Sequence, residues 1–501
     1  MDFNRRALVL ICSLISSICF IQCAHRASFP AAAESSSLLR EELDELFGDP
    51  QFANAHWGVV IRSLETGETL YQRNGNKGFM PASNMKLFTT AAALVALGPE
   101  FQYTTDICAT AAVDSEGVLQ GDLVIRGRGD PSISGRYTDG EVTAVFRAWA
   151  DSLKAHNIRS VSGRIIGDDR YFDHEILGDG WSWDYQSDYY AAQISALSFN
   201  ENCVNIVFSP GDSIGALARF RLEPETLYIS VDNQVITGDE QGGSEIYLAR
   251  KRGTNEVICR GRLSVSESEK RDWVTVEDPG KFAAVVLRDC LSAAGIRVHG
   301  EATTVRELQE GLDRVDRGQL IFQHQSPPLK ELIRTTNKVS QNLFAELLFR
   351  TVGRNVGGQG NANTAEKVEK ELFADMGIAP AYLAIADGSG LSRLNLVTPN
   401  SVAQLLTYVR RHAYGEVFYS SLPIAGEDGT ISSRMIGTAA QNNVRAKTGY
   451  IGRVRALSGY VTTRDGEELV FSMIVNNYTV PTSLANTVQD RVCERLANFR
   501  R

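Results

Sequence analysis

The sequence predicts a mixed α/β (α+β) protein in which strands from both ends of the chain form one sheet with helices packed on it. Two hairpin patterns, far apart in the chain, lead to this prediction. Strand-like residues 56–63 and 69–74 flank the turn Glu-Thr-Gly-Glu, and residues 454–463 and 468–476 flank Arg-Asp-Gly. A single sheet containing both hairpins would bring the two ends of the chain together.

Helical patterns lie close to these strands. The apolar run 85–97 is closed by Gly98 and Pro99, which predicts a buried helix. Residues 483–499 form a final amphipathic segment. Both segments are expected to pack on the sheet.

The middle of the chain, residues 101–320, has a different pattern. Short strand-like runs at 123–126, 164–167 and 204–208 alternate with turns rich in Gly, Asp and Asn. This pattern predicts a β-rich insertion and not a continuation of the same layer.

Composition bounds the class of protein. The chain has 501 residues, of which 43% are apolar and 22% charged, as in an ordinary soluble globular protein of two or three domains. The net charge of -9 and the lack of a long basic stripe argue against a nucleic-acid partner.

The N-terminus predicts export. Arg5 and Arg6 precede an almost wholly apolar run, 7–21, which has the length of a signal-peptide core and is short for a membrane span. We expect a signal peptide within residues 1–33, cleaved somewhere between Cys23 and Ala33, and a periplasmic protein. Two alternatives stay open: an uncleaved anchor, or lipidation of Cys23, although Phe-Ile-Gln before it is a poor lipobox. Membrane association is expected only through such an N-terminus.

Five cysteines follow this segment, and their spacing is too wide and irregular for a zinc site. One or two disulfides are possible in an oxidising periplasm, and the odd number leaves at least one thiol free. These residues are Cys108, Cys203, Cys259, Cys290 and Cys493.

Ser83 and Lys86 form a candidate nucleophile and base. A serine hydroxyl needs a base to remove its proton, and positions i and i+3 share one face of a helix. If the Lys86 amine is neutral, it can be that base. About one Ser-x-x-Lys is expected by chance in a chain of this length, so the motif alone is weak.

Two further motifs follow in order. Ser340-Gln-Asn342 lies at a predicted helix start, and Lys447-Thr-Gly449 comes just before the strand-like run 454–463. Taken singly, these residues could be only helix caps, turns or exposed charges. Three such motifs in this order are hard to explain by coincidence.

The ordered motifs resemble those of penicillin-binding proteins and class A β-lactamases. About 250 residues separate Lys86 from Ser340, far more than in class A β-lactamases. The chain therefore resembles a low-molecular-mass, class C penicillin-binding protein of the D-alanyl-D-alanine carboxypeptidase/endopeptidase type. Further stretches similar to that family are 121–126, 129–131, 180–184, 189–192, 387–393 and 426–430.

The resemblance implies a transpeptidase fold, an antiparallel sheet with helices on both faces. It also implies that the β-rich insertion comprises two small domains. After the signal peptide we expect the N-terminal part of the transpeptidase-like domain at 34–100, the insertion at 101–325, and the C-terminal part at 326–501.

By resemblance, Ser83 attacks the terminal D-Ala-D-Ala bond and forms an acyl-enzyme. Lys86 acts as the neutral base, its pKa lowered by burial and by Lys447. Ser340 relays a proton toward the leaving amine, and Asn342 holds the substrate amide.

The strand motif is expected to bind the rest of the substrate. Lys447 and Thr448 bind the anionic C-terminus, and Gly449 lets the peptide lie against the strand. Backbone N–H groups of Ser83 and Tyr450 form the oxyanion hole.

Tyr450 departs from the family pattern, in which Thr or Ser usually follows Lys-Thr-Gly. Its hydroxyl lies farther out, so we expect altered carboxylate contacts and an intact nucleophile. Asp184 and Arg393 are weaker candidates, by resemblance, for recognising the amine-and-carboxylate end of a diaminopimelate side chain.

The expected partners are peptidoglycan stem peptides that end in D-Ala-D-Ala, with β-lactams as covalent inhibitors. No metal or organic cofactor is expected. Two rival interpretations remain: a β-lactamase or esterase on the same scaffold, and a non-catalytic peptidoglycan-binding protein, which only Tyr450 favours.

Overall fold

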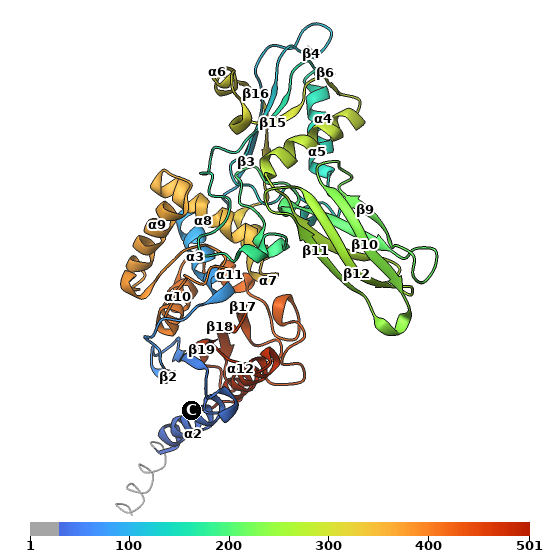
Figure 1. Cartoon of the computed structure of the whole chain (residues 1–501). Helices are drawn as coiled ribbons and strands as arrows, with labels where there is room; N and C mark the ends of the chain where they lie inside the picture. Colours follow the sequence, from blue (N-terminus) through green and yellow to red (C-terminus); the bar gives the residue numbers. More distant parts are fainter. Residues whose placement is uncertain (1–29) are drawn as a thin grey trace, which may run out of the picture.

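The computed structural model describes residues 30–501 (Figure 1). The predicted signal peptide lies outside these residues except for its last four positions, and Cys23 lies outside them altogether. Figure 1 shows a body formed by both ends of the chain, and an insertion at its upper end from which a strand-rich arm extends to one side.

The body is organised around a five-stranded antiparallel sheet in the order β17-β18-β19-β1-β2. Its strands are β1 (His56–Ser63), β2 (Thr69–Arg73), β17 (Arg445–Ile451), β18 (Val454–Thr462) and β19 (Glu468–Asn476). β1 and β19 pair along their length, from His56 opposite Asn476 to Ser63 opposite Leu469. The predicted joining of the two hairpins is confirmed, and β17 is left at one edge.

Helices cover both faces of this sheet. Along β1, Val59 and Ile61 belong to one buried cluster and Val60 to another, because successive strand residues point to opposite faces. The first cluster is completed by α2 (Pro30–Phe47) and α12 (Thr482–Ala497). The second is completed by α3 (Met85–Leu97), α7 (Leu329–Lys338), α8 (Asn342–Gly357), α9 (Ala362–Asp375), α10 (Pro399–Arg411) and α11 (Gly415–Ser421). The helix α2 was not predicted, and it begins inside the segment assigned to the signal peptide.

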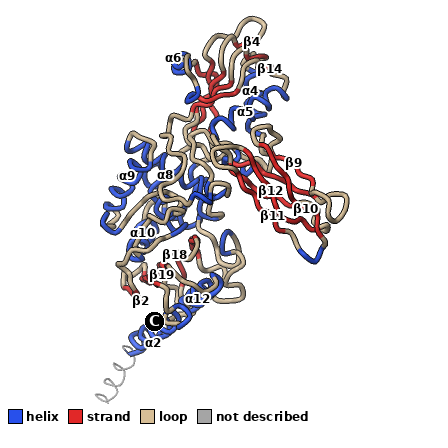
Figure 2. Tube along the Cα trace, viewed as in Figure 1, coloured by secondary structure: helices blue, strands red, loops and turns tan. Residues whose placement is uncertain are grey.

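The insertion runs from β3 (Thr104–Ala109) to β16 (Gln319–Gln325) and is rich in strands, as Figure 2 shows. Its sheets have the orders β15-β7-β5-β3-β16, β14-β6-β4, β13-β8-β9 and β10-β12-β11. The strands between its ends are β4 (Val118–Leu119), β5 (Leu123–Arg126), β6 (Ser160–Val161), β7 (Ile165–Asp168), β8 (Cys203–Ser209), β9 (Arg219–Glu223), β10 (Ser230–Gly238), β11 (Glu245–Arg250), β12 (Glu256–Ser264), β13 (Lys270–Thr275), β14 (Arg297–Val298) and β15 (Ala302–Thr304).

Three helices that the sequence pattern did not indicate also lie in the insertion: α4 (Ala144–Ala155), α5 (Pro279–Ala293) and α6 (Leu312–Asp316). One continuous buried cluster includes residues of β3, β8 and β12. The division of the insertion into two domains stays a prediction.

The cysteines within residues 30–501 are all free thiols, so the disulfides considered above do not form between them. No helix of this described part is both long enough and apolar enough to cross a membrane.

Candidate active site

Ser83 lies in a turn that is held against the sheet. It is the central residue of the short 3-10 helix η2 (Ala82–Asn84), which leads directly into α3. Asn84 is fully buried and connects this turn to two strands: its amide donates to the Lys447 carbonyl at 2.7 Å and its carbonyl oxygen accepts from Ser458 Oγ at 2.7 Å. The sequence analysis did not single out Asn84, although its two hydrogen bonds hold the Ser83 turn against the sheet.

The Lys86 amine has three oxygen neighbours. Its Nζ lies 3.0 Å from Ser83 Oγ, 2.6 Å from Asn342 Oδ1 and 2.7 Å from the Ser389 carbonyl oxygen. A neutral amine has two N–H groups and one lone pair. Because the carbonyl oxygens of Asn342 and Ser389 can only accept, they take the two N–H groups. The lone pair is then left to accept the Ser83 hydroxyl proton.

Burial makes the neutral amine available. Lys86 is fully buried, and loss of hydration lowers its pKa to about 7, although the carboxylates of Asp387 and Glu346 act in the opposite direction. Lys447 is also fully buried, and its pKa is well below the usual range because of burial, then repulsion from Lys86, then Arg455. Burial is thus the main cause of the lowered pKa of both amines.

The first and last residues of the second motif contact different lysines. Ser340, which has a left-handed backbone (φ 61°), accepts from Lys447 Nζ at 2.8 Å, whereas Asn342 contacts Lys86. The Asn342 amide nitrogen donates to the Tyr190 carbonyl at 2.7 Å. Both ends of this amide are therefore engaged within the protein. A relay through Ser340 and a substrate contact by Asn342 stay predictions.

The third motif brings β17 against the nucleophile. A Cβ on Gly449 would lie 2.6 Å from the Pro81 carbonyl oxygen and 3.3 Å from the Ala82 Cβ. Glycine is needed here because the Ser83 turn packs directly on the strand, a reason that differs from the substrate contact we expected. Thr448 Oγ1 lies 2.8 Å from Thr430 Oγ1 of the short helix η10 (Gly429–Ile431).

A cleft of about 520 Å³ opens over these residues. Its lining includes Ser83, Ser340, Asn342, Thr448 and Tyr450, of which Tyr450 is 57% exposed. Three tyrosines that belong to the insertion form another wall. They are Tyr185, Tyr189 and Tyr190.

The residues from 39 to 499 match the model of the D-Ala-D-Ala carboxypeptidase 3 (S13) family. The chain belongs to this family. It is 35% identical over 486 residues to the D-alanyl-D-alanine carboxypeptidase of Actinomadura sp. (strain R39), with 94% of this chain and 87% of that protein covered. It is 28% identical to D-alanyl-D-alanine carboxypeptidase DacB of Haemophilus influenzae, with 84% and 85% covered.

Solved structures agree with the assignment to the S13 family. Penicillin binding protein 4 (dacB) of Haemophilus influenzae matches with a TM-score of 0.78 at 25% identity, covering 92% of this chain and 99% of that one. Its complex with a β-lactam matches with a TM-score of 0.72 at 24% identity, over the same shares of the two chains. The predicted family, fold and serine-type D-Ala-D-Ala carboxypeptidase activity are confirmed.

In this S13 carboxypeptidase the segment 387–393 contacts the Lys86 amine. Buried Asp387 accepts from the backbone N–H groups of Gly390 at 2.7 Å and Ser392 at 2.6 Å. Glu346 accepts from the Ser389 N–H at 2.8 Å, which aims the Ser389 carbonyl at Lys86. The stretch had matched the family pattern, but nothing in the sequence indicated that it contacts the base.

The two weaker candidates do not line the cleft themselves, but each lies next to a residue that does, Tyr185 or Gly452. Asp184, in the short helix η4 (Trp183–Tyr185), accepts a hydrogen bond from the Ser182 hydroxyl. Arg393 donates to the Gly452 carbonyl at 3.0 Å. Neither is among the described residues that line the cleft, so their roles stay predictions.

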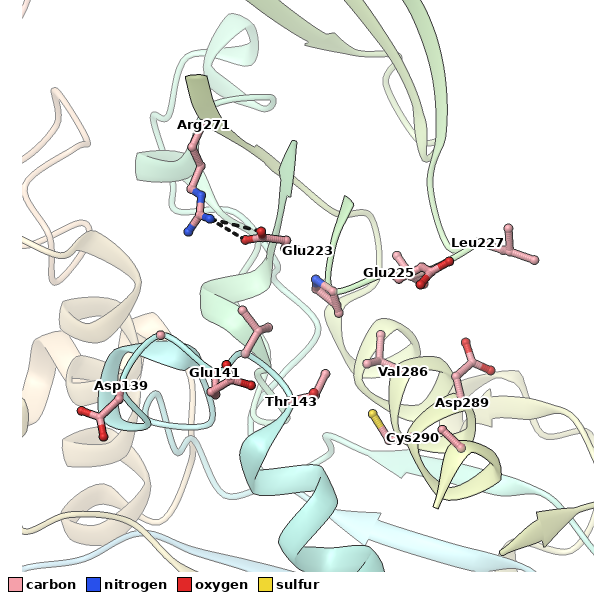
Figure 3. Close-up of a pocket in the computed structure, with 15 residues that line it drawn as sticks. Asp139, Glu141, Thr143, Glu223, Glu225, Leu227, Arg271, Val286, Asp289 and Cys290 are labelled. Carbon is pink, nitrogen blue, oxygen red and sulfur yellow. Dashed lines mark hydrogen bonds and ion pairs between the residues drawn. The ribbon is translucent and has the colours of Figure 1, made fainter. Parts of the chain in front are cut away.

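A second, larger hollow of about 940 Å³ lies in the insertion, between the segment 139–143, the loop after β9 and α5 (Figure 3). Acidic side chains surround it, and Glu223 is paired with Arg271 at 2.9 Å. It shares no described lining residue with the cleft over Ser83.

Proposed function

We propose that Ser83 is the acylated nucleophile, and that its substrates are periplasmic peptidoglycan stem peptides ending in D-Ala-D-Ala. The observation that carries the proposal is the Lys86 amine, whose two N–H groups are taken by Asn342 and Ser389 while its lone pair faces Ser83 Oγ at 3.0 Å. A base held in this way can accept a proton from only one partner, the nucleophile.

The reaction follows from these positions. The Ser83 proton passes to Lys86 Nζ as Oγ attacks the carbonyl carbon of the penultimate D-alanine. N–H groups of Ser83 and Tyr450 stabilise the oxyanion, each contributing about 3 kcal/mol. The C–N bond then breaks, and the leaving amine takes a proton from Lys86, directly or through Ser340. Ser340 Oγ accepts from Lys447, which leaves its own proton free to donate onward. Water later hydrolyses the ester.

The position of β17 supports extended binding of the peptide. The strand is at the edge of its sheet, so its outer side is open to an added peptide strand. We propose that this allows cleavage of cross-linked stem peptides as well, which is DD-endopeptidase activity. The insertion, proposed at 101–325, contributes Tyr185, Tyr189 and Tyr190 to the lining of the same cleft.

We also propose that β-lactams acylate Ser83, by analogy with the Haemophilus influenzae protein whose structure is described as complexed with a β-lactam. The ester would then break down slowly. Fast release of opened β-lactam would favour the rival β-lactamase interpretation.

The experiment measures D-alanine released from a soluble peptide ending in D-Ala-D-Ala. Wild type and Ser213→Ala, an exposed serine in a turn of the insertion, should release it equally, and Ser83→Ala should release none. Release by Ser83→Ala at the wild-type rate would refute the mechanism. No release by wild type would favour a non-catalytic peptidoglycan-binding protein.

A further inference from the structure

Arg455 lines the cleft and forms no ion pair with any described residue. Of the described residues that line the cleft, Arg455 alone carries a permanent charge. Lys447 is close by, but burial and neighbouring cations hold its pKa well below the usual range, and its Nζ already contacts Ser340 and the Thr448 carbonyl. A substrate with a free C-terminal carboxylate therefore meets one guanidinium, together with a buried lysine whose amine already has hydrogen-bond partners within the protein.

One of the three guanidinium nitrogens of Arg455 is hydrogen-bonded within the described residues, and the other two are not. Its Nε donates to Asn486 Oδ1 of α12 at 2.6 Å. Within residues 30–501, neither terminal nitrogen has a hydrogen-bond partner, and the carboxylate of Asp490 is paired with Arg434 at 2.7 Å. A partly buried guanidinium with two unused nitrogens matches the two oxygens of a carboxylate.

Tyr450 lies directly opposite Arg455 in the pairing of β17 with β18, so both side chains lie on the same face. The guanidinium carbon is 5.8 Å from the centre of the Tyr450 ring, within the range of a cation–π contact. The ring that replaces a small hydroxyl after Lys-Thr-Gly thus covers one side of the cation. The terminal nitrogens of Arg455 are the charged groups of the described cleft lining, in which Thr430 and Thr448 are uncharged.

We propose that Arg455, anchored by Asn486 and flanked by Tyr450, binds the C-terminal carboxylate of the substrate. The inference rests on the proposed function, because it concerns the leaving-group end of the same peptide. It makes Arg455 a specificity-determining residue: an anionic terminus is bound at two points, and a neutral one gains nothing from the guanidinium.

The test compares a soluble peptide ending in D-Ala-D-Ala with the same peptide carrying a C-terminal amide. Wild type should have a kcat/KM at least about tenfold higher for the acid, since a hydrogen-bonded charge pair typically contributes that much. Arg455→Gln should lose about 10- to 100-fold on the acid and less than about threefold on the amide. Arg455→Lys should be intermediate, since it keeps the charge without the fork.

Arg453→Gln is the matched control, because it removes a cation from the same hairpin at a residue that does not line the described cleft. It should leave both substrates unchanged. Asn486→Ala, which removes only the anchor, should lower activity on the acid alone. These variants keep the test decisive if Arg455→Gln unfolds, which its thermal unfolding would reveal.

The outcomes separate this inference from the proposed function. Equal wild-type activity on acid and amide, or equal losses on both in folded Arg455→Gln, would overturn the role of Arg455 while leaving the carboxypeptidase intact. No D-alanine release by wild type would contradict the proposed function and this inference with it.

Discussion

Raising the pH from about 6 to about 8 should speed the acylation of Ser83, because only the neutral form of Lys86 can accept its proton. With a pKa of about 7, Lys86 is neutral in about one molecule in ten at pH 6, about half at pH 7 and about nine in ten at pH 8. Acylation at limiting substrate should therefore rise about tenfold over this range and then level off. An exposed lysine, with its pKa near 10.5, would give a rate still rising tenfold per unit at pH 8.

The assay is kcat/KM for the D-Ala-D-Ala peptide against pH, which reports groups of the free enzyme. Burial raises the pKa of Glu346 to about 7 as well, so Glu346→Gln separates the two groups: a midpoint that remains in this variant belongs to Lys86 and not to Glu346. The Glu346 carboxylate raises the pKa of Lys86, so its removal should move the midpoint to lower pH. A profile that is flat between about pH 6 and 9, or a midpoint near 10, would refute the assignment of a neutral Lys86 as the base.

Two other changes have predictable results. Gly449→Ala places a methyl 2.6 Å from the Pro81 carbonyl oxygen, so we expect a loss of about 1–3 kcal/mol in thermal unfolding and slower acylation; wild-type stability would contradict the close packing. Glu369 is fully buried, both its oxygens lack partners within the described residues, and burial and Glu346 raise its pKa well above the ordinary value. A raised carboxyl pKa stabilises the fold at low pH, and this stabilisation is lost as pH rises through the folded-state value. The melting temperature of Glu369→Gln, relative to that of wild type, should therefore increase as the pH is raised from about 5 to 8. A difference in melting temperature that does not change with pH would refute this.

Sequence patterns predicted correctly those helices and strands whose ends depend on residues nearby in the chain. The helix at 85–97 and the strand at 56–63 have the predicted bounds, because an apolar run closed by Gly98 and a hairpin turn act within a few residues. The pairing of β1 with β19 could be proposed because both hairpins needed a sheet to complete them. α2 was not predicted. Its first four residues, 30–33, were assigned to the signal peptide, and the partners of its buried residues, such as Leu39 and Leu43, lie on strands distant in the sequence.

The candidate site divides in the same way. The proximity of Ser83 to Lys86 could be predicted, because residues three positions apart in a helix lie on the same face. Ser389, Glu346 and the tyrosine wall could not be assigned their contacts, because they reach the base and the cleft from segments 100 to 300 residues away. The reason for Gly449 was also beyond the sequence, since it depends on how closely the Ser83 turn approaches β17.

The site of the covalent adduct tests the central claim most directly. The protein is incubated with a penicillin, digested, and the modified peptide is sequenced by mass spectrometry. The account predicts one adduct of intact penicillin mass on Ser83, formed in wild type and in Ser213→Ala. An adduct on another residue, or an adduct that still forms in folded Ser83→Ala, would contradict it.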